Sequence, residues 1–327
     1  MIERLRAFTY ERQRLGRAAP NAARALKDVI AVYSAHPSAP LSLHARAKAM
    51  DARAFHRLEV LRVPAMRMSI HLLPAKTAHL AFRATPAPPA DRKKRMKHFK
   101  LTEARYAELR GQILKAAAEP LTLPELREAV GARPEEFKGT SAQMTRDGEL
   151  VRIGAKGLRS NELRYVVAQL DEADADRALE WLAGEYLRAF GPVRQKDFVW
   201  WAGVTAGRAK AALAAHDTQE LDGGLLIRTE DVKAFERTKP ATGADLLPKW
   251  DVYTMGYAPD GRDRFAHPDV VAQCYDLRGD GRPVILVDGQ AAGTWEKLEP
   301  GPFEKAGPKV AKAIGERLDA VKAFLGD

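Results

Sequence analysis

Cysteine is almost absent from this sequence, and so are long apolar runs. The single cysteine, Cys274, excludes an intramolecular disulfide, and a lone thiol suits a reducing compartment, so we expect a cytoplasmic protein. Cys274 lies in an apolar run, which favours a place in the core over a role as nucleophile. The charged segment 1–16 lacks the apolar stretch of a secretory signal. No stretch approaches the roughly 18 apolar residues that a membrane span needs.

The signatures of several enzyme classes are also missing. The sequence has no Walker-type phosphate loop, no clustered His and Cys at metal-ligand spacing, and no Gly-x-Ser-x-Gly elbow. Kinase, metalloenzyme and hydrolase-elbow functions therefore have little support. We expect neither a metal site nor an organic cofactor.

Positive charge is in excess. The 53 Lys and Arg residues exceed the 43 Asp and Glu residues, so the formal net charge is +10. Such an excess favours a polyanionic partner, because each phosphate that a protein neutralises releases condensed counterions. The alternative is a basic surface without a nucleic-acid partner. The length of 327 residues predicts two or three structural units.

Periodicity predicts an α+β fold with a repeated pattern. The clearest linker is 85–100, which has a proline cluster followed by a basic run. After it, three helices precede a hairpin with strands at 150–153 and 163–167, and Thr122 is a good N-cap for the second helix. Three helices followed by a glycine-turned hairpin are typical of a winged helix. The pattern recurs between 179 and 228, where Thr205 caps the third helix.

The N-terminal third is a looser copy of this pattern. We expect one helix over 22–35, another over 51–60, and a strand over 65–73 whose alternation places Arg67, Ser69 and His71 on one face. Asp288 and Gly289 predict a two-residue hairpin turn, and 308–325 predicts a terminal helix. The sequence therefore predicts three tandem winged-helix units around a concave basic channel: 1–90, 91–170, and 171–327 with a C-terminal hairpin and helix.

A winged helix suits double-stranded DNA, because one helix enters a groove and the hairpin reaches the adjacent backbone. Basic residues lie on the helices and wings that would make such contacts. The candidate DNA-binding residues are Arg67, Ser69, His71, Arg146, Arg152, Lys156, Arg159, Arg208 and Lys210. The alternative for Arg67, Ser69 and His71 is a buried hydrogen-bond network. We expect the protein to act as a monomer.

Three stretches resemble a known family. Segment 67–74 is similar to an Arg-x-Thr-x-His motif, with Ser69 in place of Thr. Segment 190–204 resembles a Gly-Pro-Val, Asp, Trp-x-Gly pattern, and 246–257 with 285–295 resembles paired Leu-Pro-x-x-Asp and Val-Asp-Gly elements. Together they resemble the AlkZ/YcaQ family of bacterial winged-helix DNA glycosylases. The resemblance implies DNA repair by hydrolysis of the N-glycosidic bond of alkylated purines, including bulky adducts and interstrand crosslinks, without a cofactor.

The sequence departs from this family at the motif that carries its chemistry. The family has Gln-x-Gln or Gln-x-Asp near the end of an early helix, where the polar side chains position water and stabilise positive charge on the sugar. Here Tyr33 and Ala35 occupy those two positions. Tyr33 follows the apolar stripe of the expected helix, which favours a place in the core. His36 is a candidate base or electrophile, since its unperturbed pKa of about 6.5 lies near neutrality. Tyr33 and His36 are therefore the candidate catalytic residues.

Three functions stay open from the sequence. One is an active glycosylase with a diverged site, and the second is a non-catalytic DNA-binding protein that senses damage or regulates transcription. The third is a protein-interaction module. A polar, water-accessible pocket near Tyr33 and His36 would favour the enzyme, and a sealed apolar plug would count against it. Asp251 matches a family position and has either a functional or a structural role.

Overall fold

The chain alternates groups of helices with β-hairpins, and each hairpin closes one group. The computed structural model describes residues 1–48, 50–168 and 170–326. The chain begins with α1 (Ile2–Arg12). The first group is α2 (Ala22–Val29), α3 (Ser38–His44), α4 (Ala52–His56), β2 (Val60–Ala65) and β3 (Ser69–Pro74). The second is α7 (Glu103–Ala116), α8 (Leu123–Val130), α9 (Pro134–Arg146), β4 (Leu150–Ile153) and β5 (Arg164–Val167). The third is α10 (Ala175–Phe190), α11 (Gln195–Ala202), α12 (Ala206–Ala214), β6 (Thr218–Leu221) and β7 (Leu225–Arg228).

The local signals of the second and third groups agree with these elements. Glu125 N–H donates to Thr122 Oγ1, and the Glu125 carboxylate accepts from Thr122 N–H in return, which makes a capping box at α8. Thr205 caps α12 through the Arg208 N–H. Side-chain capping satisfies backbone donors that have no partner within the helix. These two positions could therefore be predicted from the sequence.

One sheet joins the first two groups. It has five strands in the order β1-β3-β2-β4-β5, where β1 is Val32–Tyr33. The junction between the groups is the pairing of Arg62 on β2 with Arg152 on β4. Along the chain, α5 (Ala75–Ala84) and α6 (Pro89–His98) lie between the first and the second group. The side chains of both hairpins therefore meet on one continuous surface.

A second sheet holds the C-terminal part. Its four strands follow the order β11-β10-β9-β8, and α15 (Pro308–Leu325) packs on β8. The strands are β8 (Ala244–Leu247), β9 (Val284–Val287), β10 (Gln290–Glu296) and β11 (Glu299–Pro302). Asp288 and Gly289 both have positive φ at the turn between β9 and β10, as the sequence predicts. Shorter helices connect the remaining segments: α13 (Val232–Glu236), the 3-10 helix η2 (Pro259–Arg264) and α14 (Pro268–Val271).

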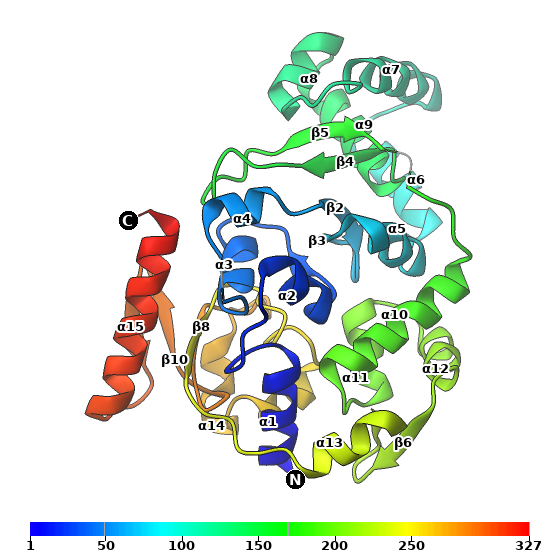
Figure 1. Cartoon of the computed structure of the whole chain (residues 1–327). Coiled ribbons are helices and arrows are strands. Elements are labelled where there is room, and N and C mark those ends of the chain that lie inside the picture. The colour runs from blue at the N-terminus through cyan, green and yellow to red at the C-terminus, as the bar shows by residue number, and fades with distance from the viewer. Residues whose placement is uncertain (49, 169, 327) are drawn as a thin grey trace.

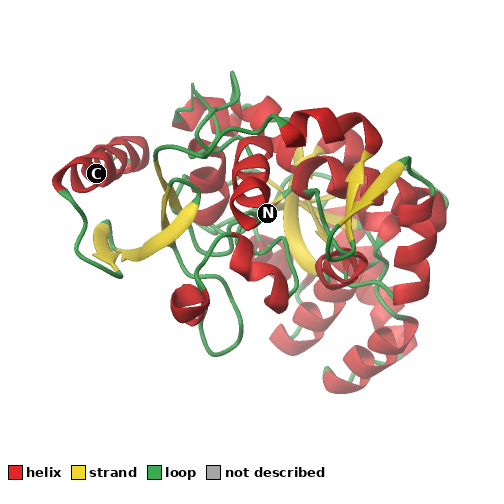
Figure 2. Cartoon of the chain, turned by 90° about the horizontal axis from the view of Figure 1, so that it is seen from below, coloured by secondary structure: helices red, strands yellow, loops and turns green. Residues whose placement is uncertain are grey.

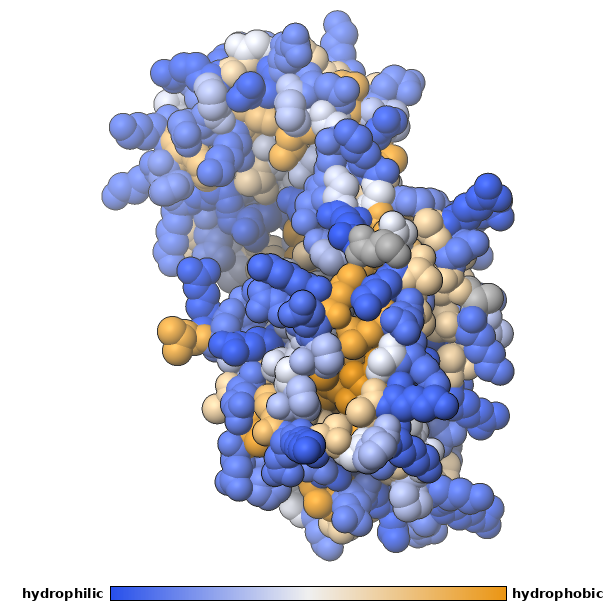
Figure 3. All heavy atoms as spheres, turned by 90° about the vertical axis from the view of Figure 1, so that its left-hand side faces the viewer, coloured by the Kyte–Doolittle hydropathy of each residue, from blue (hydrophilic) through white to orange (hydrophobic). Residues whose placement is uncertain are grey.

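The helices α7 and α8 lie at one end of the molecule, and α13, β6 and the N-terminus lie at the other (Figure 1). The terminal helix α15 stands beside the C-terminal sheet at one side of the molecule (Figure 2), where it also contacts α3. The face that carries α15 is largely hydrophilic, with one apolar strip across it (Figure 3). Within the described ranges, no helix combines the length and the apolarity needed to cross a bilayer.

The structure corrects the helix expected over 22–35. The helix α2 ends at Val29, Ile30 adopts a φ of 72°, and Val32 and Tyr33 form β1 against β3. Pairing with β3 satisfies the backbone of β1, and β-branched and aromatic residues favour strands. Tertiary contact therefore overrides the helical periodicity, and Tyr33 lies on a strand rather than on the inner face of a helix.

Two further expectations are wrong. The strand expected over 65–73 is a hairpin, because Arg67 and Met68 both have positive φ, near 57°, and reverse the chain between β2 and β3. No Asn-Gly or Asp-Gly pair announces this turn. The basic run inside 85–100 is the helix α6 rather than a linker, since its Met96 is buried and its Arg92 pairs with Glu103 at 2.6 Å.

Candidate functional site

A pocket of about 520 Å³ lies over the five-stranded sheet. Its walls combine side chains of both hairpins that share this sheet with loops of the C-terminal part. The volume falls in the range of about 300–1,000 Å³ that is typical of ligand sites. The lining residues are Tyr33, Ser34, Ala35, Arg67, Ser69, Ile70, Arg152, Asn161, Leu163, Tyr165, Trp250, Met255 and Asp280. We call this cavity the Tyr33 pocket.

The Tyr33 pocket contains Tyr33 and Ala35, the two positions at which the resemblance in sequence places the motif of the similar family. Tyr33 projects from β1, and Ala35 follows two residues later in the same wall. The Ala35 side chain has no polar atom, so only Tyr33 contributes chemistry there. Because the lining is partly polar and open to water, the cavity is not a sealed apolar plug.

Arg67 fixes the Tyr33 hydroxyl. Its guanidinium donates to Tyr33 Oη at 2.5 Å and stacks 3.8 Å from the centre of the Trp200 ring. Arg67 N–H donates to the Ala202 carbonyl, and Gly203 has no room for a Cβ beside the Arg67 backbone. The turn between β2 and β3 is therefore held against the end of α11, which places a positive charge at the pocket wall.

Tyr33 is a hydrogen-bond donor in this setting. Burial raises the pKa of its hydroxyl, and the opposing charge of Arg67 does not reverse the shift. The hydroxyl is therefore protonated at neutral pH. Because its oxygen already accepts from Arg67, its proton is available to another acceptor. Tyr33 can donate a proton or a hydrogen bond, but it is no base.

His36 lies behind the pocket wall rather than in its lining. Its Nδ1 is 3.0 Å from the Leu158 carbonyl oxygen, and its Nε2 is 3.1 Å from Arg62 Nη2. Burial, and then the charge of Arg62, lowers the pKa of His36 to about 4. The neutral ring thus donates through Nδ1 to Leu158 and accepts from Arg62 through Nε2. This arrangement uses both ring nitrogens to join the segment after β1 to the sheet and to the β4–β5 loop.

Asn161, from the same loop as Leu158, binds the backbone of the segment after β1. Its Oδ1 accepts from the His36 N–H at 2.8 Å, and its Nδ2 donates to the His36 carbonyl at 3.2 Å. Asn161 belongs to the loop between β4 and β5, and it lines the Tyr33 pocket. The hairpin of the second group therefore closes over the segment that carries Tyr33 and Ala35.

His71 lies under the pocket floor. Its side chain is buried, its Nδ1 lies 3.0 Å from the Ser69 carbonyl oxygen, and its ring centre is 4.6 Å from that of Tyr33. Burial lowers its pKa to about 4, so the ring is neutral. Ser69 lines the pocket, but His71 supports it from below. The sequence predicted that Arg67, Ser69 and His71 share one face of a strand. Arg67 and Ser69 line the cavity, and His71 does not.

The other candidate DNA-binding residues lie on the second group, in α9 and the β4–β5 hairpin, and on α12 of the third group. Arg152 lines the pocket, with its guanidinium 5.4 Å from the Tyr165 ring centre. The remaining five lie outside the lining: Arg146 on α9, Lys156 and Arg159 on the β4–β5 loop, and Arg208 and Lys210 on α12. Lys156 lies 3.8 Å from Glu162, and Arg208 lies 3.0 Å from Asp176. Lys156, Glu162 and Asp176 are exposed and Arg208 is half-buried, and ion pairs at such surface positions stabilise the fold little.

Sequence reasoning did not single out the lining residues Asn161, Tyr165 and Asp280. Tyr165 alternates on β5, so a signal existed for it, whereas Asp280 comes from a distant C-terminal loop. Among the lining residues that the structure describes, Asp280 alone carries a carboxylate. In the same part of the chain, no group of His, Cys, Asp or Glu suits a metal ion.

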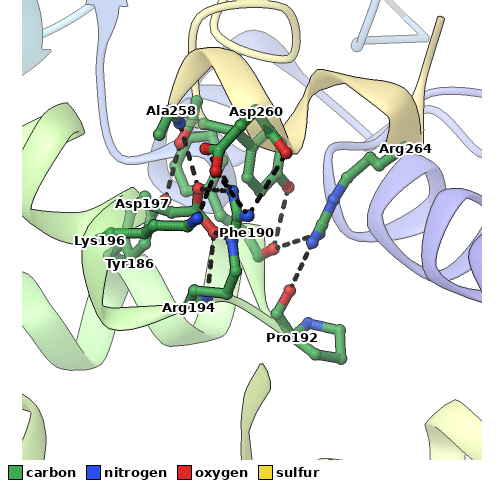
Figure 4. Close-up of polar contacts among 11 residues, drawn as sticks. Tyr186, Phe190, Pro192, Arg194, Lys196, Asp197, Ala258, Asp260 and Arg264 are labelled. Carbon is green, nitrogen blue, oxygen red and sulfur yellow. Dashed lines mark hydrogen bonds and ion pairs between the residues drawn. The ribbon is translucent and has the colours of Figure 1, made fainter. Parts of the chain in front are cut away.

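Several residues in the family-like stretches have structural roles. Asp197 is buried at the start of α11, where it accepts from Arg194 and from the Ala258 N–H, and Asp260 extends this network to Lys196 (Figure 4). The network ties α11 to η2. Trp201 and Trp295 are buried, and Trp295 Nε1 donates to the Leu247 carbonyl at 2.9 Å.

Asp251 also has a structural role. Its carboxylate accepts from Arg46 at 2.6 Å, and both side chains are fully buried. Asp251 further accepts from Ser42 at 2.7 Å and from the Tyr253 N–H at 2.9 Å. These bonds connect α3 to the loop that carries Trp250, which has a φ of 60° and lines the pocket. The pair therefore positions one wall of the Tyr33 pocket.

Comparisons with known proteins agree on one family and one fold. A family model described as "DNA glycosylase AlkZ-like" matches residues 26–302. The Streptomyces sahachiroi DNA glycosylase AlkZ superposes with a TM-score of 0.78 at 20% sequence identity, over 99% of this chain and 96% of that one. At this identity the superposition shows a shared fold. No sequence match was found among curated proteins.

Proposed function

The chain belongs to the AlkZ-like DNA glycosylase family, and we propose that it binds double-stranded DNA and hydrolyses the N-glycosidic bond of an alkylated base at the Tyr33 pocket. The observation that carries this proposal is the pocket itself. It opens at the two positions of the family's catalytic motif, and it gathers two arginines, aromatic rings and a carboxylate. Water-accessible polar groups are what glycosidic hydrolysis requires, because a cationic sugar must be stabilised and a water oriented.

DNA binding is proposed from charge and from the repeated architecture. We interpret the three groups of helices and hairpins, 1–90, 91–170 and 171–327, as tandem winged-helix units that line a concave basic channel. The net charge of +10 favours a phosphate backbone as the partner. Arg67 and Arg152 would contact phosphates next to the pocket, and Arg146, Lys156, Arg159, Arg208 and Lys210 would extend this contact. We propose that the protein acts on DNA in the cytoplasm as a monomer.

An exposed apolar side chain, Leu277, lies close in the sequence to Asp280 of the Tyr33 pocket. Leu277 is fully exposed in the turn that also contains Asp280. Proteins that distort a duplex insert apolar side chains between base steps. Leu277 therefore supports the proposal that this part of the molecule contacts DNA.

The substitutions at Tyr33 and Ala35 favour a second candidate function. A protein that binds damaged DNA without cutting the glycosidic bond would need no water-orienting motif, and neither side chain accepts a proton from water at neutral pH. Both candidate functions require binding to damaged DNA. They differ only in whether the N-glycosidic bond is hydrolysed. One experiment therefore separates the two.

We expect purified protein to release alkylated purines from a duplex. Duplexes with N3- or N7-alkylated purines, a bulky adduct or an interstrand crosslink would be incubated with the protein, and free base would be measured by chromatography. An unmodified duplex serves as the control. Release from at least one damaged duplex supports the glycosylase. Binding to every duplex without any base release would leave the non-catalytic function.

DNA affinity should fall steeply with salt and depend on Arg152. A plot of the logarithm of the binding constant against the logarithm of the salt concentration should be linear. Its slope should be about −0.9 for each phosphate that the protein contacts. Arg152→Gln should weaken binding about tenfold and reduce that slope by about 1. Lys312→Gln on α15 removes the same charge elsewhere and should change neither. Affinity that does not respond to salt would refute DNA binding through this surface.

A further inference from the structure

Asp280 contributes the acidic side chain to the lining of the Tyr33 pocket in the described part of the chain. Asp280 is half-buried, and its backbone N–H donates to Asp276 Oδ1 at 3.0 Å. Within the described ranges, its carboxylate makes neither a hydrogen bond nor an ion pair. A carboxylate whose lone pairs are free can accept hydrogen bonds from water or from a ligand in the cavity.

The backbone around Asp280 is fixed on both sides. Asp276 accepts from the N–H groups of Arg278 and Asp280, and the carbonyl of Asp280 accepts from the Asp276 N–H at 2.9 Å. On the other side, Gly281 pairs with Tyr275, and its carbonyl accepts from the Trp250 N–H at 3.0 Å. This frame fixes the backbone from which the carboxylate projects. Groups held in advance of reaction stabilise developing charge without reorganisation.

Among the described residues that line the Tyr33 pocket, no side chain other than that of Asp280 is a carboxylate. Burial raises the pKa of Tyr33, Arg67 opposes this shift, and the negative charge of Asp280 raises it further. Tyr33 is thus a proton donor, Arg67 and Arg152 are cations, and Ala35 is apolar. The pocket therefore pairs one carboxylate with donors that can hold a phosphate or a leaving base.

We propose that Asp280 is the catalytic carboxylate of the Tyr33 pocket, where it orients the attacking water and stabilises the positive charge that develops on the deoxyribose. This inference rests on the proposed glycosylase function. It assigns to a turn in the C-terminal part the task that the family motif performs from the segment at Tyr33 and Ala35. The polar group would thus reach the sugar from a different segment of the pocket lining.

The reaction balances with water as the only co-reactant. The bond between C1′ and the base nitrogen breaks, and its electron pair leaves with the base. An alkylated purine with a positive charge departs as a neutral base. The water oxygen then bonds to C1′, and its proton passes to the Asp280 carboxylate and from there to solvent. The products are the free base, an abasic site and one proton.

The test compares Asp280→Asn with the wild type in single-turnover excision and in DNA binding. Asparagine preserves the shape of the side chain but removes its charge and basicity. Excision should slow by about 10²–10⁴-fold, which is typical for loss of a positioned base. Affinity for a duplex with a neutral tetrahydrofuran site should change less than threefold. Asp263→Asn, an exposed residue outside the pocket lining, makes the same change in net charge and should leave the rate unchanged.

A second readout does not depend on activity. One duplex carries a cationic pyrrolidine at the lesion and mimics the charged sugar, and the other carries the neutral tetrahydrofuran. The wild type and Asp263→Asn should prefer the cationic duplex by more than tenfold, and Asp280→Asn should lose this preference. Equal affinity of the wild type for both duplexes would overturn the role of Asp280.

The outcomes separate the two proposals. If the wild type excises a base and Asp280→Asn works within threefold of its rate, the Asp280 assignment is wrong and the glycosylase stands. If the wild type releases no base from any damaged duplex, the glycosylase function is wrong. The pyrrolidine preference then decides whether Asp280 still provides the cation-binding group of the pocket.

Discussion

Replacing Asp251 by asparagine is expected to lower the free energy of unfolding by about 3–5 kcal/mol, because the charge of Arg46 would stay buried without its partner. Both side chains are fully buried, and Arg46 also donates to the Ser42 carbonyl. An unpaired charge in such a place loses its hydration and gains no compensating interaction. Urea unfolding at pH 7 would measure the change.

The matched control is Asp260→Asn. This carboxylate pairs with Arg194 and Lys196 but is 58% exposed, so its loss should cost less than about 1 kcal/mol. The double variant Arg46→Met with Asp251→Leu removes both charges and should recover much of the lost stability. A loss below 1 kcal/mol in Asp251→Asn would contradict the account of this pair. Because the pair holds the loop of Trp250, Asp251→Asn should also loosen the wall of the Tyr33 pocket that Trp250 forms.

Acidification should destabilise the protein through two buried histidines. His36 and His71 both have a pKa of about 4 in the folded state, because burial opposes their charged forms. The unfolded chain binds these protons near pH 6.5. Their stabilising effect is therefore complete above pH 6.5 and is lost as the pH falls from 6.5 towards 4. At pH 5 each histidine should account for about 2 kcal/mol of lost stability, or about 4 kcal/mol together.

Unfolding free energies measured in urea at pH 7.5 and pH 5 would test this expectation. The ring resonances of His36 and His71 should show no titration between pH 7 and pH 5 in the folded protein. The pKa of His44 is also lowered, by burial and by Arg317, so it acts in the same direction. Equal stability at the two pH values, or titration of either ring near 6.5, would show that the rings are not held neutral as described.

The proposed chemistry uses residues that no local pattern connects. Tyr33 and Arg67 meet because β1 pairs with β3 and because a hairpin turn places Arg67 against Trp200. Asp280 reaches the same cavity from a C-terminal turn. The bond between Asn161 and the His36 backbone joins the second hairpin to this wall. The residues Tyr33 and Ala35 therefore change one wall of the pocket, while the segments that carry Arg67, Asn161 and Asp280 keep the pocket polar.

The sequence by itself determined the elements whose signals are local. Thr122 and Thr205 cap helices that form where expected, Asp288 and Gly289 make the expected turn, and the stretches of 190–204 and 246–257 indicate the family. Helix capping and turn formation depend on residues that are neighbours in the sequence, so they can be predicted without the tertiary structure.

Only the tertiary structure decided the site. Val32 and Tyr33 follow a helical periodicity, yet strand pairing with β3 placed Tyr33 at a cavity instead of in the core. Arg67 reverses the chain at positive φ without a turn signature, because the end of α11 holds it there. Asp280 lies in a local turn that Asp276 closes, and the bond from the Trp250 N–H to the Gly281 carbonyl joins this turn to a distant wall of the pocket. Long-range pairing and burial bring these groups together, and neither is encoded within a local stretch of residues.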